Sequence, residues 1–189
     1  LKKHTTDLDV GKHHKMNRLL EQLPEEKLKA ASRSSSTLFD WNDSSTWKSA
    51  LEGVSHVYLT YYPDLAIEAS AAHITAFCNL ASSMNVKHIT LLSGRGEPAA
   101  QICEAILIDS GLSWNIVRAS WFNQNFSEGA FIDFVLDGVV ALPMPEARIP
   151  FVDANDIADV VSKVLVDDAY NGQTITVTGP EMRTFEEVV

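Results

Sequence analysis

The feature that most constrains the fold is a regular alternation of two kinds of segment from residue 27 onward. Short runs rich in Val, Ile, Leu and Thr alternate with longer runs in which apolar residues recur at helical spacing. The short runs predict strands and the longer runs predict helices. Strands joined through helices form βαβ units, in which the strands are parallel. The sequence therefore predicts an α/β fold with a doubly wound parallel sheet.

The positions of the expected elements follow from this alternation. Strands are expected at 27–32, 55–60, 86–93, 114–118 and 173–178. Helices are expected after Asp64, which is placed to cap the first of them, after Pro98, at 125–136 and at 156–165. In the helix that begins at Pro98, the expected buried stripe consists of Ile102, Cys103, Ile106 and Leu107.

Composition restricts the compartment in which such a chain is expected. The 189 residues are 46% hydrophobic and 21% charged, which is typical of one globular domain. We expect neither a secretory leader nor a membrane span, because the apolar runs are interrupted every few residues. The two cysteines, Cys78 and Cys103, predict free thiols in a cytoplasmic protein rather than a disulfide scaffold.

Charge restricts the class of partner. The chain carries a net charge of −10, although residues 1–33 hold eight Lys/Arg and only five Asp/Glu. The remaining acidic body argues against binding to nucleic acid or to an anionic membrane surface. His4, His13 and His14 lack further ligands at zinc spacing, so no metal is expected.

Both ends of the chain depart from a complete domain of this class. The first strand of such a sheet is buried on both faces, and Asp7 and Asp9 would place charges there. At the other end, Thr184 and Glu187 form a capping-box motif just before the sequence stops. We therefore expect a sheet that is incomplete at both ends. The expected units are a basic segment at 1–26 and a C-terminally truncated domain at 27–189.

The sequence matches a phosphate-binding glycine motif only weakly. Dinucleotide-binding folds begin with a strand that leads into G-x-G-x-x-G, and the front of this chain offers Gly11 alone. The run 94–99 matches G-x-G-x-x-A between a strand and a helix, and is either a phosphate loop or a tight turn. Glu97 would place a carboxylate beside a pyrophosphate, and no acidic residue follows the next strand. The turn is therefore the favoured interpretation.

Seven short motifs, taken in order, carry a resemblance to a known family. They are 32–34, 39–43 with 46–47, 57–60 with Pro63, 86–93, 118–126, 149–153 with 156–158, and 178–181. Together they resemble the NmrA-like branch of the atypical short-chain dehydrogenases, and within it the festuclavine-dehydrogenase group and similar bacterial NAD(P)-binding proteins. The resemblance covers residues 30–189 and implies a Rossmann-like sheet that binds NADPH or NADH.

The resemblance also implies a set of binding positions where the strands end. Arg33 is expected to meet the 2′-phosphate of NADP, which favours NADP(H) over NAD(H), unless it is a plain surface residue. Trp41 lies either beside the adenine or in the core. The implied cofactor-binding positions are Arg33, Ser34, Asp40, Trp41, Thr60, Tyr61, Pro63, Ser93 and Ala119. The implied substrate pocket contains Trp121, Phe122 and Asn125.

The implied function is that of an NAD(P)H-dependent oxidoreductase acting on a small organic acceptor. In ordinary short-chain dehydrogenases a Tyr-x-x-x-Lys pair handles the proton, and this pair does not occur in the sequence. The catalytic residues are therefore unassigned. The alternatives are a non-catalytic NAD(P) redox sensor with a regulatory role, and an inactive truncated member of the family.

Overall fold

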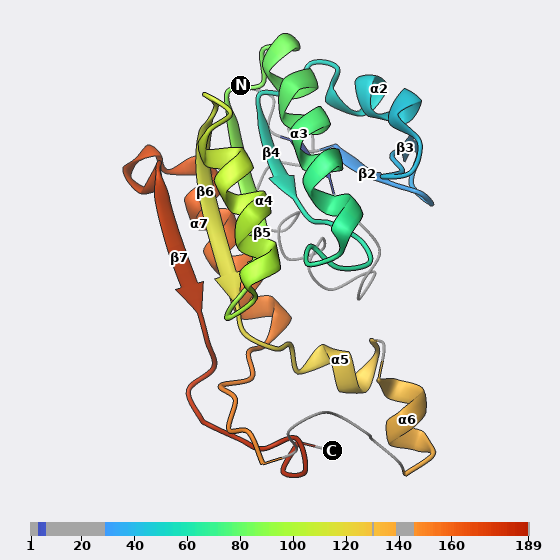
Figure 1. Ribbon diagram of the computed structural model, residues 1–189, viewed down its shortest axis with the longest axis vertical. Helices are drawn as coiled ribbons and strands as arrows, with labels where there is room; N and C mark the ends of the chain where they lie inside the picture. Colours follow the sequence, from blue (N-terminus) through green and yellow to red (C-terminus); the bar gives the residue numbers. More distant parts are fainter. Residues whose placement is uncertain (1–3, 7–28, 130, 139–145, 189) are drawn as a thin grey trace.

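One parallel sheet organises the part of the chain that the structure describes. The computed structural model describes residues 4–6, 29–129, 131–138 and 146–188. Seven strands lie in the order β3-β2-β1-β4-β5-β6-β7, and all neighbouring pairs are parallel (Figure 1). The strands are β1 (His4–Thr6), β2 (Ala30–Ser32), β3 (Thr37–Leu38), β4 (His56–Leu59), β5 (His88–Gly94), β6 (Ser113–Ala119) and β7 (Gln173–Val177).

Strand β1 is the third of the seven strands and lies inside the sheet, where we expected a strand to be missing. It pairs with β2 on one side and with β4 on the other. The expectation was wrong because β1 ends at Thr6 and so includes neither Asp7 nor Asp9. The sheet is therefore continuous between β2 and β4. Asp7, Asp9 and Gly11 themselves lie outside the described residues.

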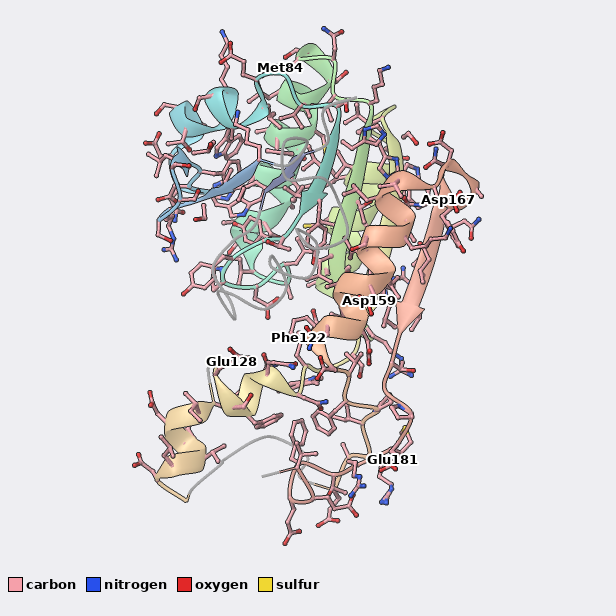
Figure 2. All side chains as sticks on the ribbon, turned by 180° about the vertical axis from the view of Figure 1, so that it is seen from behind. Met84, Phe122, Glu128, Asp159, Asp167 and Glu181 are labelled. Carbon is pink, nitrogen blue, oxygen red and sulfur yellow. The ribbon has the colours of Figure 1, made fainter. Side chains whose placement is uncertain are left out.

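Helices cover both faces of the sheet. On one face lie α2 (Trp47–Leu51), α3 (Glu68–Ser83) and α4 (Pro98–Ile108), and α7 (Ala154–Val166) lies on the other, as Figure 2 shows from behind. Alternate side chains of β4 point to the two faces, since Val57 and Leu59 join the core beneath α3 and α4 while Tyr58 joins the core beneath α7. The doubly wound arrangement is therefore confirmed. Two short 3-10 helices, η2 (Ser44–Thr46) and η3 (Asp168–Tyr170), contact α2 and α7 respectively.

Helix α3 begins later than the sequence indicates. The Asp64 carboxylate accepts a hydrogen bond from the Ala66 N–H at 2.8 Å, so it closes a turn instead of capping the helix. Ile67 is extended and precedes the first helical residue, Glu68. The Ser70 hydroxyl donates to the carbonyl oxygens of both Leu65 and Ile67 at 2.7 Å, which ties this turn to the start of α3.

The buried stripe of α4 contains other residues than expected. Cys103 and Leu107 are buried as predicted, whereas Ile102 is 58% exposed. Ala100 and Glu104 are buried in its place, which gives the helical spacing 100, 103, 104 and 107. The α4 stripe therefore contains a carboxylate that the apolar pattern does not reveal.

The expected helix at 125–136 is divided into α5 (Gln124–Ser127) and α6 (Ile132–Leu136). Gly129 lies between them, and a Cβ added there would lie 2.7 Å from the Cα of Asn125. These two helices lie beyond the carboxyl edge of the sheet, together with the last residues of the chain (Figure 1). Phe126, Phe151 and Phe185 form a separate apolar cluster there.

The capping-box motif near the end of the chain forms both of its hydrogen bonds. The N–H of Thr184 donates to Glu187 Oε2 at 2.9 Å, and the N–H of Glu187 donates to Thr184 Oγ1 at 3.2 Å. Between them, Phe185 is buried in the aromatic cluster. The motif therefore anchors this segment against α5.

Within the described ranges, no helix combines the length and the hydropathy that a membrane span requires.

Candidate functional site

The carboxyl edge of the sheet gathers the residues that follow each strand. In open α/β sheets, ligands bind along this edge. Arg33 and Ser34 follow β2, Thr60 follows β4, and Ala119 ends β6. Figure 1 shows the strands running toward this edge, beyond which α5 and α6 lie. Most of the predicted cofactor positions therefore share one side of the molecule.

Arg33 meets Tyr62, a residue after β4 that was not among the predicted positions. The guanidinium carbon of Arg33 lies 4.6 Å from the centre of the Tyr62 ring. Because β1 lies between β2 and β4, this contact spans the end of that strand. The Ser32 hydroxyl oxygen accepts from the N–H groups of Ser34 and Ser35 at 3.2 and 3.0 Å, which shapes the loop that carries Arg33. The loop thus presents a cation at the position expected for recognition of a phosphate.

Trp41 and Tyr61 lie in the core beneath this edge. Trp41 is 3% exposed and its Nε1 donates to the Thr60 carbonyl oxygen at 3.1 Å. The Trp41 and Tyr61 ring centres are 4.8 Å apart, and the Tyr61 hydroxyl lies 2.7 Å from His73 Nδ1. Burial raises the pKa of Tyr61. Trp41 therefore occupies the core, one of its two predicted locations, and fixes the backbone where β4 ends.

Asp40 and Pro63 differ in burial and in their contacts at the carboxyl edge. The Asp40 carboxylate accepts from the Asn42 N–H at 2.9 Å, and its carbonyl oxygen accepts from Trp47 Nε1 at 2.7 Å. Asp40 is thus half-buried and engaged in the turn that follows β3. Pro63 is exposed and follows a cis peptide bond with Tyr62.

An ion pair between the partly exposed Arg118 and the buried Glu104 lies where β5 and β6 end. The Ser93 hydroxyl donates to Glu104 Oε1 at 2.6 Å, and Arg118 Nε donates to Oε1 and Oε2 at 2.9 and 3.1 Å. Glu104 is 2% exposed. The sequence analysis missed this cluster, although Glu104 follows Cys103 directly on the buried stripe. The Ser93 hydroxyl is therefore directed at Glu104 beneath α4.

The run 94–99 forms a tight turn, as the favoured interpretation predicts. Gly96 has a φ of +80°, and Pro98 occupies the first turn of α4. The Glu97 side chain folds back over Gly94, where an added Cβ would lie 2.1 Å from Glu97 Oε2. A side chain at position 94 would therefore displace this carboxyl group. Burial and the nearby charge of Asp64 raise the pKa of Glu97.

The three predicted pocket residues lie on one segment, but their side chains diverge. Trp121 joins the aromatic cluster, with its ring centre 5.0 Å from that of Phe185. Phe122 instead packs against the core beneath α7 and bridges to Val152. Asn125 is half-buried, and its carbonyl oxygen accepts from the Phe131 N–H at 3.0 Å. The segment therefore borders the carboxyl edge without forming a closed pocket from these three side chains alone.

A further contact that the sequence analysis did not anticipate joins this segment to α7. Gln124 Nε2 donates to Asp153 Oδ2 at 3.0 Å, and Gln124 Oε1 accepts from the Ala154 N–H at 2.9 Å. Asp153 also caps α7 through the Asn155 N–H at 2.7 Å. The start of α7 and the segment after β6 therefore form one connected unit. Across the described ranges, no group of three or more His, Cys, Asp or Glu side chains is arranged to hold a metal ion.

Comparison with known sequences identifies relatives of roughly twice the length. No family model matches the chain. The prestalk A differentiation protein A of Dictyostelium discoideum is 31% identical over 153 residues, which is 80% of this chain and 50% of that protein. An agroclavine dehydrogenase of Claviceps fusiformis is 31% identical over 163 residues, 79% of this chain and 56% of the enzyme. A festuclavine dehydrogenase of Aspergillus fumigatus is 28% identical over 170 residues, 80% and 57% of the two chains. The chain thus spans about half the length of the curated relatives it matches.

Solved structures share the fold at low sequence identity. An NADPH-dependent quinone oxidoreductase from Escherichia coli, complexed with NADPH, superposes with a TM-score of 0.78 at 20% identity. The match covers 96% of this chain and 70% of that structure. NmrA, a negative transcriptional regulator in complex with NAD, superposes with a TM-score of 0.67 at 16% identity, over 99% and 69% of the two chains. The Rossmann-like sheet that the resemblance implied is therefore confirmed.

Proposed function

The chain is an NmrA-like homologue of the agroclavine and festuclavine dehydrogenases, and from this premise we propose that it is an NAD(P)H-dependent oxidoreductase acting on a small organic acceptor. The proposal rests mainly on one observation, the Arg33–Tyr62 contact across the end of β1. In this class of sheet the dinucleotide crosses the carboxyl edge at the central strand. The reduced nicotinamide would supply the hydride.

The residues at the carboxyl edge have the chemistry that such a cofactor needs. The Arg33 guanidinium can pair with the 2′-phosphate of NADPH, and the Ser34 hydroxyl can add a hydrogen bond. NADP(H) is therefore the preferred cofactor. Thr60, Tyr61 and Pro63 would border the dinucleotide through the backbone after β4, and Ser93 and Ala119 would flank the nicotinamide. Asp40 would lie toward the adenine, with Trp41 supporting the site from the core.

The acceptor would lie between the ends of β5 and β6 and the segment after β6. Trp121, Phe122 and Asn125 belong to that segment and supply apolar surface and an amide. An acidic chain of net charge −10 favours neutral or cationic acceptors over anionic ones. We place the 27–189 region, completed by β1, as the cofactor-binding unit.

A regulatory role is the second candidate, and the missing Tyr-x-x-x-Lys pair favours it. In that case the chain would bind the dinucleotide without turning over an acceptor. The NAD-bound regulator NmrA has the same fold. Both candidate functions predict cofactor binding, so turnover of an acceptor is the measurement that distinguishes them.

Calorimetric titration of the folded chain with NADPH and NADH tests the proposal. We expect micromolar binding with a preference for NADPH, followed by oxidation of NADPH at 340 nm when a quinone or an azo dye is added. Binding without turnover of any acceptor would support the regulatory role. If the folded chain binds neither dinucleotide, both candidate functions are wrong.

A further inference from the structure

We propose that Glu97 is the proton donor to the acceptor, in the place that the Tyr-x-x-x-Lys pair holds in ordinary short-chain dehydrogenases. This inference rests on the proposed oxidoreductase function and adds a catalytic residue to it. Glu97 lies in the turn between β5 and α4, at the carboxyl edge of the sheet.

The Glu97 carboxyl group lies against the end of β5. It packs directly over Gly94, the last residue of β5, which leaves no space for a Cβ atom. Gly94 pairs in register with Ala119 of β6, and the Arg95 N–H donates to the Ala119 carbonyl oxygen at 2.9 Å. The carboxyl group therefore lies beside the junction of β5 and β6. That junction is where the nicotinamide and the acceptor are expected to meet.

Two hydroxyl groups on this side of the sheet are already engaged. The Ser93 hydroxyl donates to the buried Glu104, and the Tyr61 hydroxyl is paired with His73 within the core. The Glu97 carboxyl group, by contrast, caps no helix N–H and accepts no hydrogen bond from the described part of the chain. It is half-buried, so it is both desolvated and within reach of a ligand at the edge.

The surroundings of Glu97 favour its protonated form. Burial is the main cause of its raised pKa, and the carboxylate of Asp64 in the β4–α3 turn adds to the effect. The neighbouring residue Arg95 is exposed to solvent, and its backbone N–H binds the Ala119 carbonyl oxygen. A carboxyl group whose pKa is raised holds its proton more readily, which favours proton donation over a permanently ionised state.

This role defines the class of acceptor. A quinone, carbonyl or azo acceptor takes a hydride at one atom and needs a proton on its oxygen or nitrogen. The Glu97 carboxyl group gives that proton, becomes a carboxylate, and regains a proton from water after product release. NAD(P)H is oxidised to NAD(P)⁺ and the acceptor gains two electrons and two hydrogens. A cationic acceptor such as a triarylmethane dye needs only the hydride, because hydride addition already yields a neutral product.

The difference between these acceptors provides the first test. We compare reduction of 1,4-naphthoquinone and of a cationic triarylmethane dye by NADPH, using the full chain and its Glu97→Gln variant. Glu97→Gln should lower kcat for the quinone about 100-fold and change kcat for the dye less than about twofold. The matched control is Glu52→Gln, which makes the same chemical change at an exposed residue after α2 and should affect neither rate. Equal quinone rates for Glu97→Gln and the unsubstituted chain would overturn the role of Glu97 while leaving the oxidoreductase function intact.

The second test does not depend on turnover. Carbon-13 NMR of the full chain labelled at glutamate Cδ follows each carboxyl group against pH, and Glu97→Gln identifies the Glu97 signal by its loss. We expect Glu97 to titrate well above the exposed glutamates, and to titrate higher still or lose its response when NADPH is added. A Glu97 signal that titrates with the exposed glutamates overturns the proposal. If the unsubstituted chain reduces neither acceptor, the oxidoreductase function and the role of Glu97 fail together.

Discussion

Arg118 of β6 holds Glu104 of α4 through a bidentate contact, in which Nε donates to Oε1 at 2.9 Å and Nη2 donates to Oε2. Glu104 is almost completely buried, and the Ser93 hydroxyl donates to the same carboxylate. Three elements, β5, β6 and α4, are therefore joined through one charged group. The turn that carries Glu97 connects β5 to α4. The ion pair therefore also holds together the two elements on either side of the proposed proton donor.

Removing Arg118 should destabilise the fold. Arg118→Ala leaves the Glu104 carboxylate buried with Ser93 as its remaining partner, and an uncompensated buried charge costs about 3 kcal/mol. The free energy of unfolding, measured by urea denaturation and circular dichroism, should fall by about that amount. The control is Arg148→Ala, since Arg148 and Glu187 form an exposed pair at 3.6 Å that should contribute less than about 1 kcal/mol.

The double variant Glu104→Leu/Arg118→Leu separates the loss of an ion pair from the loss of packing. Replacing a buried pair by apolar side chains is often close to neutral. We expect the double variant to be more stable than Arg118→Ala alone. If the double variant is less stable than Arg118→Ala, the ion pair contributes net stability to the fold.

His88 should make the fold sensitive to mild acid. Burial, and secondarily the neighbouring His56, lower the pKa of His88 from 6.5 to about 4, and its two ring nitrogens lie 3.0 Å from Ser113 Oγ and 3.1 Å from Thr90 Oγ1. The unfolded chain then binds a proton near pH 6.5 that the folded chain does not bind until about pH 4. The stability contributed by neutral His88 is therefore full above pH 6.5 and is lost as the pH falls toward 4.

The expected size of this effect is a loss of about 2 kcal/mol between pH 7.5 and pH 5. Urea titrations at a series of pH values should show this slope in the unsubstituted chain. In His88→Gln the same interval should be nearly flat apart from the contributions of other groups. An equal slope in both chains would assign the acid sensitivity elsewhere.

Both thiols should be unreactive in the folded chain. Cys78 is 2% exposed, and burial raises its pKa to about 11, while burial also raises the pKa of the fully buried Cys103. The thiolate is the reactive form, so labelling by Ellman's reagent at pH 8 should be at least about 100-fold slower than in urea. The chain unfolded in urea should release two equivalents of chromophore, one for each cysteine. Rapid labelling of the native chain would contradict the burial of these residues.

The sequence specified the layers of the fold better than their exact limits. Apolar periodicity predicts β4, β5, β6, β7 and α7, because each has a buried face whose pattern is regular. It does not reveal β1, because a three-residue strand of His and Thr carries no apolar pattern, and its neighbour Asp7 is charged. The late start of α3 was equally hidden, since Asp64 forms a turn with Ala66 through the same carboxylate chemistry that caps helices.

For the candidate site too, positions along the chain were easier to predict than side-chain contacts. The resemblance implied positions near strand ends for Arg33 and Ser93; Arg33 directly follows β2, and Ser93 is the last but one residue of β5. What each side chain contacts depends on elements distant in sequence, as with Ser93 and Glu104, and no local pattern encodes it. Glu97 was noted only as an obstacle to phosphate binding. Its proximity to Gly94 and Asp64 became evident only from the packing of two adjacent turns.

Arg33 should determine the choice between the two dinucleotides. Its guanidinium lies over the Tyr62 ring, so its fork is held at the edge where the 2′-phosphate of NADPH would lie. Arg33→Ala removes charge-assisted hydrogen bonds that NADH does not make, and should weaken NADPH binding about 10- to 100-fold. Binding of NADH should change less than about threefold, and calorimetric titration of both dinucleotides measures the difference.

Arg95→Ala provides the matched control for this prediction, because Arg95 is also an exposed arginine at the carboxyl edge but follows β5 instead of β2. It should alter NADPH and NADH binding by the same small factor. Raising the salt concentration should weaken NADPH binding more in the unsubstituted chain than in Arg33→Ala, since the lost contact is ionic. An equal loss of NADPH and NADH affinity in Arg33→Ala would place Arg33 outside the 2′-phosphate site and remove the basis for an NADP(H) preference.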